Sequence, residues 1–168
     1  VGRGTRSVLQ PLSMSAKKRS GRLAVGEFDY GGSLWQAQRI GIPELHKQGL
    51  TGDGILIAVL DAGFSGSDHQ STSSLDIVAT RDFVSGAANV NQHGHGTSVL
   101  SAMAGFAQGQ LVGPAFGATF ALGRTEIAEQ EIKAEEDSWI AGAEWADSLG
   151  ADILNSSLTY TTWDDGSG

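Results

Sequence analysis

Cysteine is absent from the 168 residues of this chain, so disulfide bonds and thiolate metal sites are excluded. Long apolar runs are absent as well: the longest, residues 55–60, is far shorter than the ~18 residues that a membrane-spanning helix needs. With 40% apolar and 18% charged residues, the composition is typical of a folded globular domain rather than a disordered chain. The sequence therefore predicts a globular protein that has no membrane as a partner.

Acidic residues are absent from residues 1–22, which hold six of the 11 basic residues. The other five basic residues share the rest of the chain with all 19 acidic residues. We interpret residues 1–26 as a basic arm, either a linker or the remnant of a pro-segment, although arms of this kind also bind nucleic-acid phosphates. Because the body of the chain is strongly acidic, we expect no nucleic-acid partner.

Apolar segments alternate with segments of helical period along the rest of the chain. Residues 55–60 form a continuous apolar run, which is typical of a strand buried on both faces of a parallel sheet. Similar signals predict three further strands, the last of them also buried, around residues 77–79, 118–122 and 152–155. Helices are predicted after a capping Ser33, from Pro43, and over residues 97–105 and 127–149. This order predicts an α/β fold with three layers, a parallel sheet with helices on both faces.

Two polar residues lie at positions where parallel α/β sheets usually carry functional sites. Asp61 directly follows the first apolar run, at the carboxyl end of the strand. Taken alone, Asp61 is better explained as a turn-capping aspartate. His95 lies between two glycines at the start of a helix of small residues, and glycines allow close approach of the backbone. His93 and His95 also suggest zinc, but residues at i and i+2 share no helix face, and no carboxylate or cysteine set lies nearby in sequence. We predict no metal ligand here.

Three segments resemble motifs of the subtilisin-like serine proteases, the subtilase family or peptidase family S8. Residues 57–63 (IAVLDAG) resemble the aspartate motif of the family, and residues 95–105 (HGTSVLSAMAG) resemble its histidine motif. Residues 150–158 (GADILNSSL) are similar to the strand that forms a wall of the substrate site. The resemblance implies a subtilisin-like fold, so we interpret residues 27–168 as the N-terminal portion of a catalytic domain.

The resemblance implies that Asp61 is the aspartate of an Asp-His-Ser triad and that His95 is its general base. Histidine titrates near neutral pH, so it can take a proton from a serine hydroxyl and return it to a leaving amine. This works only when a carboxylate holds the other ring nitrogen in the correct tautomer. Asp61 followed by His95 also matches the chain order of subtilisin.

The resemblance also implies substrate-binding residues. Ser157 and Leu158 would line the pocket for the substrate residue before the scissile bond. The family usually has a glycine after this Ser-Leu pair, whereas this chain has Thr159. The β-branched side chain of Thr159 could narrow the pocket, so the resemblance does not establish that the pocket accepts large aromatic substrate residues. Gly123 and Arg124 would form the opposite substrate-binding strand. Three downstream acids could favour basic substrate residues, but a solvated helix start explains them better: Glu135, Glu136 and Asp137.

The nucleophilic serine and the oxyanion-hole asparagine of the family are not found in these 168 residues. We therefore expect a second polypeptide that carries both, without which the chain is inactive and the apolar face after Ile153 stays uncovered. The expected assembly is a secreted or periplasmic serine endopeptidase acting on peptides or proteins. The alternative is a catalytically inactive, truncated subtilase that binds peptides. No cofactor is required; calcium stays open as a structural ion on loop carboxylates, among them Asp68, Asp76 and Asp82.

Overall fold

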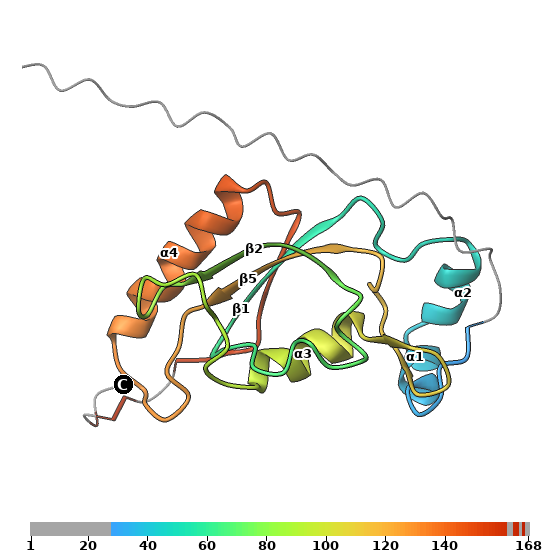
Figure 1. Ribbon diagram of the computed structural model, residues 1–168, viewed down its shortest axis with the longest axis horizontal. Helices are drawn as coiled ribbons and strands as arrows, with labels where there is room; N and C mark the ends of the chain where they lie inside the picture. Colours follow the sequence, from blue (N-terminus) through green and yellow to red (C-terminus); the bar gives the residue numbers. More distant parts are fainter. Residues whose placement is uncertain (1–27, 161–162, 165, 167–168) are drawn as a thin grey trace, which may run out of the picture.

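The computed structural model describes residues 28–160, 163–164 and 166, and the arm predicted for residues 1–26 lies outside them. Its centre is a sheet of parallel strands in the order β2-β5-β1-β6 (Figure 1). The strands are β1 (Leu56–Asp61), β2 (Asp76–Asp82), β5 (Thr119–Arg124) and β6 (Ile153–Ser156). All six residues of β1 are buried, as the continuous apolar run predicts.

Helices cover both faces of this sheet (Figure 1). Helix α3 (His95–Ala104) packs on one face, where Leu100 joins Val59, Phe120 and Leu122 in the largest apolar cluster. Helix α4 (Ala134–Ser148) packs on the other face, where Ala146 joins a smaller cluster with Ala58 and Ala121. The predicted class, a three-layer α/β fold with a parallel sheet, is therefore confirmed.

A second group of elements lies at the end of the molecule away from α4 (Figure 1). It consists of α1 (Leu34–Arg39), α2 (Ile42–Lys47) and an antiparallel pair that the sequence analysis missed, β3 (Phe106–Ala107) with β4 (Leu111–Val112). Ser33 is the N-cap residue of α1, as predicted, but its side chain makes no capping hydrogen bond. Its hydroxyl instead donates to the carbonyl of Tyr30 at 2.8 Å and accepts from the amide of Val112 at 3.0 Å, which ties α1 to the hairpin.

Helix α4 begins seven residues later than the predicted start at residue 127. The reason is Glu135, whose side chain is almost fully buried. Its carboxylate accepts the amide protons of Ile127 at 2.7 Å and Ile132 at 3.1 Å. The Glu135 carboxylate therefore ties both ends of residues 127–132 in a loop before the helix, and takes the Ile132 amide that a continuous helix would have bonded to a preceding carbonyl.

Strand β6 lies at the edge of the described sheet, paired only with β1 in the described part of the chain. Ile153 is 51% exposed and Leu154 is 37% exposed. The prediction that this strand is buried on both faces is wrong for the described chain, whereas the expectation of an uncovered apolar surface after Ile153 agrees with the structure. None of the helices within the described residues has the length and apolar character of a membrane-spanning segment.

Candidate active site

Asp61 ends the central strand β1, in register with Arg124 of β5, and its side chain is fully buried. The amide of Ala62 donates to its Oδ1 atom at 2.8 Å. The chain then turns through Gly63, whose φ of 147° is one that side-chain-bearing residues rarely adopt. A Cβ atom there would lie 2.6 Å from the amide nitrogen of His93. The local sequence thus lets the loop that precedes α3 pass directly over the end of β1.

His95 is the first residue of α3 and meets Asp61 at this point. Its Nδ1 atom lies 2.8 Å from Asp61 Oδ1, across a separation of 34 residues. Because an ionised carboxylate only accepts hydrogen bonds, Nδ1 carries the proton and Nε2 is left able to accept one. The imidazole is 47% exposed while the carboxylate is fully buried. The pair therefore offers a proton acceptor to solvent and keeps its orienting group inside.

The second oxygen of the Asp61 carboxylate, Oδ2, is buried and has no hydrogen-bond partner within the described residues. A buried negative charge with an incomplete set of donors is costly unless a positive charge forms nearby. The His95 ring, which contacts the other oxygen of the same carboxylate at 2.8 Å, is placed to interact with that charge.

Gly96 makes the contact between α3 and β1 possible. A Cβ atom at this position would lie 2.7 Å from the carbonyl oxygen of Gly63, 2.7 Å from a ring carbon of Phe64 and 2.9 Å from Asp61 Cβ. The amide of Gly96 also donates to the Gly63 carbonyl at 2.9 Å. The glycine after the histidine is thus required by the close approach of α3 to the carboxylate.

Gly96→Ala is expected to destabilise the assembled protein by about 2 kcal/mol, because backbone and a packed ring must move to admit the methyl group. Gly94→Ala is the matched control: its φ is −97°, and the nearest atom to a new Cβ would lie 3.7 Å away. Urea unfolding of both variants measures the difference. Equal stability of the two variants would contradict the packing argument.

His93, the other histidine of the motif region, is exposed, and its Nδ1 accepts the amide proton of His95 at 3.2 Å. Within the described ranges, no three His, Cys, Asp or Glu side chains are grouped so as to hold a metal ion. The zinc alternative therefore finds no support in the geometry.

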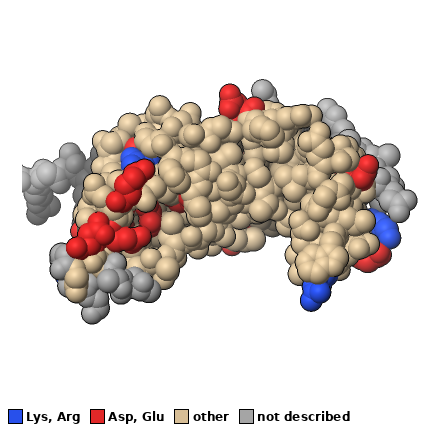
Figure 2. Space-filling view, turned by 90° about the horizontal axis from the view of Figure 1, so that it is seen from below, with Lys and Arg blue, Asp and Glu red and all other residues tan. Residues whose placement is uncertain are grey.

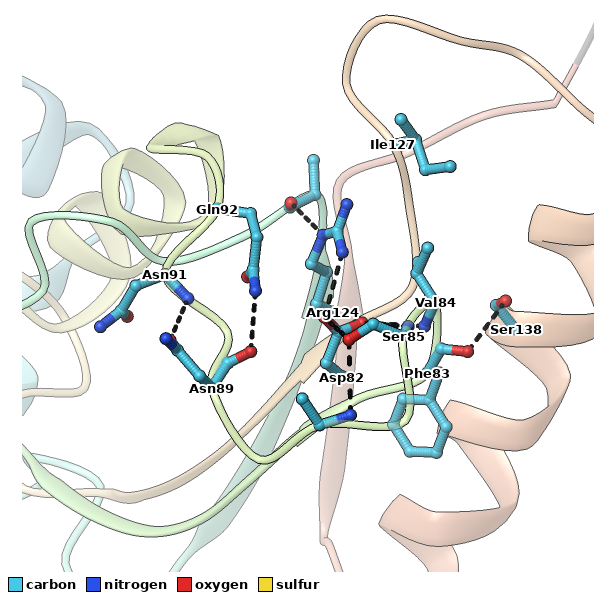
Figure 3. Close-up of polar contacts among 12 residues, drawn as sticks. Asp82, Phe83, Val84, Ser85, Asn89, Asn91, Gln92, Arg124, Ile127 and Ser138 are labelled. Carbon is cyan, nitrogen blue, oxygen red and sulfur yellow. Dashed lines mark hydrogen bonds and ion pairs between the residues drawn. The ribbon is translucent and has the colours of Figure 1, made fainter.

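The carboxylate of Asp82 does not fit a calcium ligand either. Its oxygens accept from the amides of Val84 and Ser85, from the Ser85 hydroxyl and from the Arg124 guanidinium (Figure 3). Burial acts to raise the pKa of Asp82, but the hydrogen bonds from Ser85, Val84 and Arg124 outweigh it and hold the pKa below its usual value. The lone pairs of this carboxylate are occupied by protein donors.

The predicted roles of Gly123 and Arg124 as a substrate-binding strand are not compatible with the structure. Gly123 is buried in the interior strand β5, in register with Leu60 on one side and Arg81 on the other, so its backbone is not open to a substrate. The Arg124 side chain turns to protein groups, donating to Asp82 at 3.0 Å and to the Ala62 carbonyl at 3.2 Å (Figure 3). These residues hold the ends of three strands together instead.

The other predicted substrate residues, Ser157, Leu158 and Thr159, lie on the segment that leaves β6 at the same edge as Asp61, since Leu60 pairs with Ser156. Ser157 and Thr159 are exposed and Leu158 is half-buried. The indole of Trp139 on α4 donates to the Ser156 hydroxyl at 2.9 Å and anchors the start of the segment. We call residues 157–160 the wall segment.

Sequence reasoning missed two residues at this edge, Glu126 and Tyr160. Glu126 comes two residues after β5 and is only 7% exposed, and its carboxylate accepts a hydrogen bond from the Tyr160 hydroxyl. Burial raises the pKa of Glu126, as do the nearby charges of Glu135, Glu131 and Asp61, although the Tyr160 hydrogen bond lowers it. A polar residue just after a buried strand is the same signal that singled out Asp61, and it was available at position 126.

The three acids considered as a source of preference for basic substrate residues lie at the start of α4. Figure 2 shows acidic side chains gathered at that end of the molecule. Glu135 is not among the exposed ones, because its buried carboxylate holds the loop that precedes the helix. Glu136 and Asp137 are exposed in the first turn. Negative charge there complements the helix dipole.

An aspartate and a histidine are thus joined at the carboxyl edge of a parallel α/β sheet, and the wall segment leaves the neighbouring strand at the same edge. The sequence model of the subtilase family matches residues 52–168. This chain belongs to the subtilase family, and the resemblance drawn from its three motifs is confirmed.

Individual relatives agree with this assignment. The chain is 31% identical to subtilisin BL of Lederbergia lenta over 126 residues, which is 74% of this chain and 44% of that protein. It is also 31% identical to a subtilisin of Bacillus pumilus over 123 residues, 71% of this chain and 42% of that protein. The chain thus spans less than half the length of the curated relatives it matches.

Solved structures show the same fold. Fervidolysin from Fervidobacterium pennivorans, a keratinolytic enzyme related to subtilisin, aligns with a TM-score of 0.60 and 24% identity over 77% of this chain and 21% of that one. MycP1 from Mycobacterium smegmatis aligns with a TM-score of 0.59 and 22% identity over 77% of this chain and 36% of that one.

Proposed function

We propose that this chain supplies the aspartate and the histidine of a serine endopeptidase, and that the nucleophilic serine and the oxyanion-hole asparagine come from sequence outside these 168 residues. The observation that supports this most directly is the 2.8 Å contact between His95 Nδ1 and the buried Asp61 carboxylate. It fixes the tautomer in which the exposed Nε2 can accept a proton.

The proposed reaction is acyl transfer through a covalent intermediate. His95 Nε2 takes the serine hydroxyl proton as the serine oxygen attacks the peptide carbonyl carbon, and the imidazolium is stabilised by Asp61. The C–N bond then breaks as Nε2 returns the proton to the leaving amine, which leaves an acyl-serine. Water, deprotonated by the same histidine, hydrolyses the ester and restores the serine. No step requires a cofactor, and the carboxylate of Asp82 is unsuited to calcium for the reason given above.

Peptide or protein substrates fit the wall segment. Its exposed backbone beyond β6 can pair with an extended chain in the manner of an added β-strand, with Ser157 and Leu158 beside the residue before the scissile bond. Thr159 adds a branched side chain where a glycine would leave space. Large aromatic residues are therefore expected to be poorer substrates here than in relatives that carry the glycine.

Sequence outside these 168 residues is proposed to complete the sheet and the triad. The edge strand β6 leaves Ile153 and Leu154 exposed, and covering this apolar surface would favour association. The acidic body of the chain, with a net charge of −8 overall, disfavours nucleic acid as a partner. Secretion or export to the periplasm is proposed from the kinship with subtilisins and with MycP1, a component of a type VII secretion system.

Reaction of the purified assembly with a fluorophosphonate probe tests the function. We expect the label on a serine outside these 168 residues, in the family's Gly-Thr-Ser motif, and none within residues 1–168, because a fluorophosphonate reacts only with an activated serine. Heat-denatured assembly is the control for nonspecific reaction. An intact protein that carries the motif and takes up no label would contradict the enzyme and favour a peptide-binding module.

A further inference from the structure

Two segments that leave the sheet at the Asp61 edge are joined to each other by specific hydrogen bonds. One follows β5 and contains Glu126; the other is the wall segment, which follows β6 and ends at Tyr160. The Tyr160 hydroxyl donates to Glu126 Oε1 across a separation of 34 residues, and lies 3.5 Å from the carbonyl oxygen of Glu135. We call the Glu126–Tyr160 pair the clasp.

The clasp is tied to the carboxylate end of β1 through the backbone. The amide of Thr125, the residue before Glu126, donates to the carbonyl oxygen of Asp61 at 3.0 Å. A short path of bonds therefore runs from Asp61 through Thr125 and Glu126 to Tyr160, and from there along the wall segment. These two hydrogen bonds restrain the position of the wall segment relative to Asp61.

A second link joins the continuations of these two segments beyond the clasp. The amide of Asp164 donates to the Glu131 carbonyl at 2.9 Å, and the Glu131 amide donates to the Asp164 carboxylate at 3.1 Å. The rings of Tyr160 and Trp163 are stacked with centroids 5.7 Å apart, which joins the end of the wall segment to the residues after it. Glu131 and Asp164 lie farther along the chain from β5 and β6 than Glu126 and Tyr160 do, so the clasp is the link closer in sequence to the sheet.

Burial and protonation state both favour a persistent hydrogen bond between Glu126 and Tyr160. Glu126 is 93% buried, given its exposure of 7%, and buried carboxylates are costly unless they accept hydrogen bonds. Burial and the neighbouring Glu126 both raise the pKa of Tyr160, so the hydroxyl keeps its proton and acts as a donor at every working pH. Losing the hydroxyl would leave the carboxylate oxygen unsatisfied, which costs more than the bond itself contributes.

We propose that Glu126 and Tyr160 are positioning residues that set the distance between the wall segment and the Asp61–His95 pair, so that an extended peptide bound along the wall presents its scissile carbonyl to the catalytic residues. This inference rests on the proposed function. A clasp with this role matters to substrates that lie along the wall and is indifferent to small esters that reach only the catalytic residues.

Kinetics of clasp variants in the assembled protease test the proposal. Tyr160→Phe and Glu126→Ala are expected to raise KM for a tetrapeptide anilide by about 10-fold, the equivalent of one lost hydrogen bond to a charged group. The kcat for the same substrate is expected to fall as well, because the scissile carbonyl is then less often held against the catalytic residues. Hydrolysis of p-nitrophenyl acetate is expected to change by less than about 2-fold. Glu126→Gln keeps an oxygen that can accept from Tyr160, and is expected to restore a KM near the wild-type value.

The outcomes separate the possible failures. Equal losses on the peptide and on the ester would show that the clasp only supports the fold, and unchanged KM in both Tyr160→Phe and Glu126→Ala would also overturn the proposal. If either Tyr160→Phe or Glu126→Ala fails to fold, comparison of the remaining variant with Glu126→Gln still tests the proposal. If the wild-type assembly hydrolyses neither substrate, the proposed function fails, and calorimetry of an uncleaved tetrapeptide amide then tests the clasp: weaker binding in Tyr160→Phe supports it, and unchanged or absent binding overturns it.

Discussion

His95→Ala is expected to lower kcat of the assembled protease on peptide substrates by about 10⁶-fold, because the serine then has no base to accept its proton and the leaving amine has no acid. The imidazole is 47% exposed, so its removal leaves no cavity in the core, and the assembly should remain folded. Steady-state hydrolysis of a peptide anilide measures the loss, and circular dichroism verifies that the protein is folded.

His69→Ala is the matched control for this prediction. His69 bonds within its own loop, to Ser71 at 3.1 Å, and takes no part in the contact with Asp61. It is expected to retain full turnover. Retained turnover in His95→Ala would show that another group acts as the base.

Asp61→Asn is expected to cost less, about 10⁴-fold in kcat. The amide can still occupy the site beside the Ala62 amide, but it no longer provides a negative charge to the imidazolium. An effect as large as that of His95→Ala would imply that the folded site itself is lost, which circular dichroism of the assembly would reveal.

Arg124→Met is expected to lower the free energy of unfolding by about 3–5 kcal/mol, because it leaves the fully buried Asp82 carboxylate without its counter-charge. The Arg124 side chain is itself only 11% exposed, so solvent screens the pair weakly. The variant also loses the bond to the Ala62 carbonyl, next to Asp61. Urea unfolding of the assembled, covalently inhibited protease at neutral pH measures the change.

This difference should depend on pH in a defined direction. The pKa of Asp82 is held below its usual 3.8 in the folded state, so its contribution to stability is present above that pH and is lost as the pH falls through the lowered value. The gap between wild type and Arg124→Met should therefore shrink on acidification below pH 3.8. A gap that is constant or grows would exclude the ion pair as its cause.

Arg81→Met controls for the general effect of removing an arginine at this end of the sheet. Arg81 is exposed on β2, and its guanidinium lies 5.0 Å above the Phe83 ring. Contacts of this kind at exposed sites contribute about 0.5–1 kcal/mol. A loss as large as that of Arg124→Met would mean that burial of the Asp82–Arg124 pair is not what matters.

The sequence by itself determined the layers of the fold and the two residues of the candidate site. The unbroken apolar run of β1 requires burial on both faces, and strands of that kind separated by helices can hardly pack in another way. Asp61 and His95 could be found because each sits at a local boundary, one at a strand end and one at a helix start. Strand ends and helix starts can be predicted from the residues that are adjacent in sequence.

Only the tertiary structure decided the rest, because it depends on which distant segments become neighbours. Gly123 and Arg124 looked like an open edge in sequence, but strand order places β5 inside the sheet and turns Arg124 toward Asp82. The clasp between Glu126 and Tyr160 joins segments that meet only after β1, β5 and β6 have paired. Local periodicity specifies which face of an element is apolar; it does not specify strand order or register, which are set by the packing of the whole sheet.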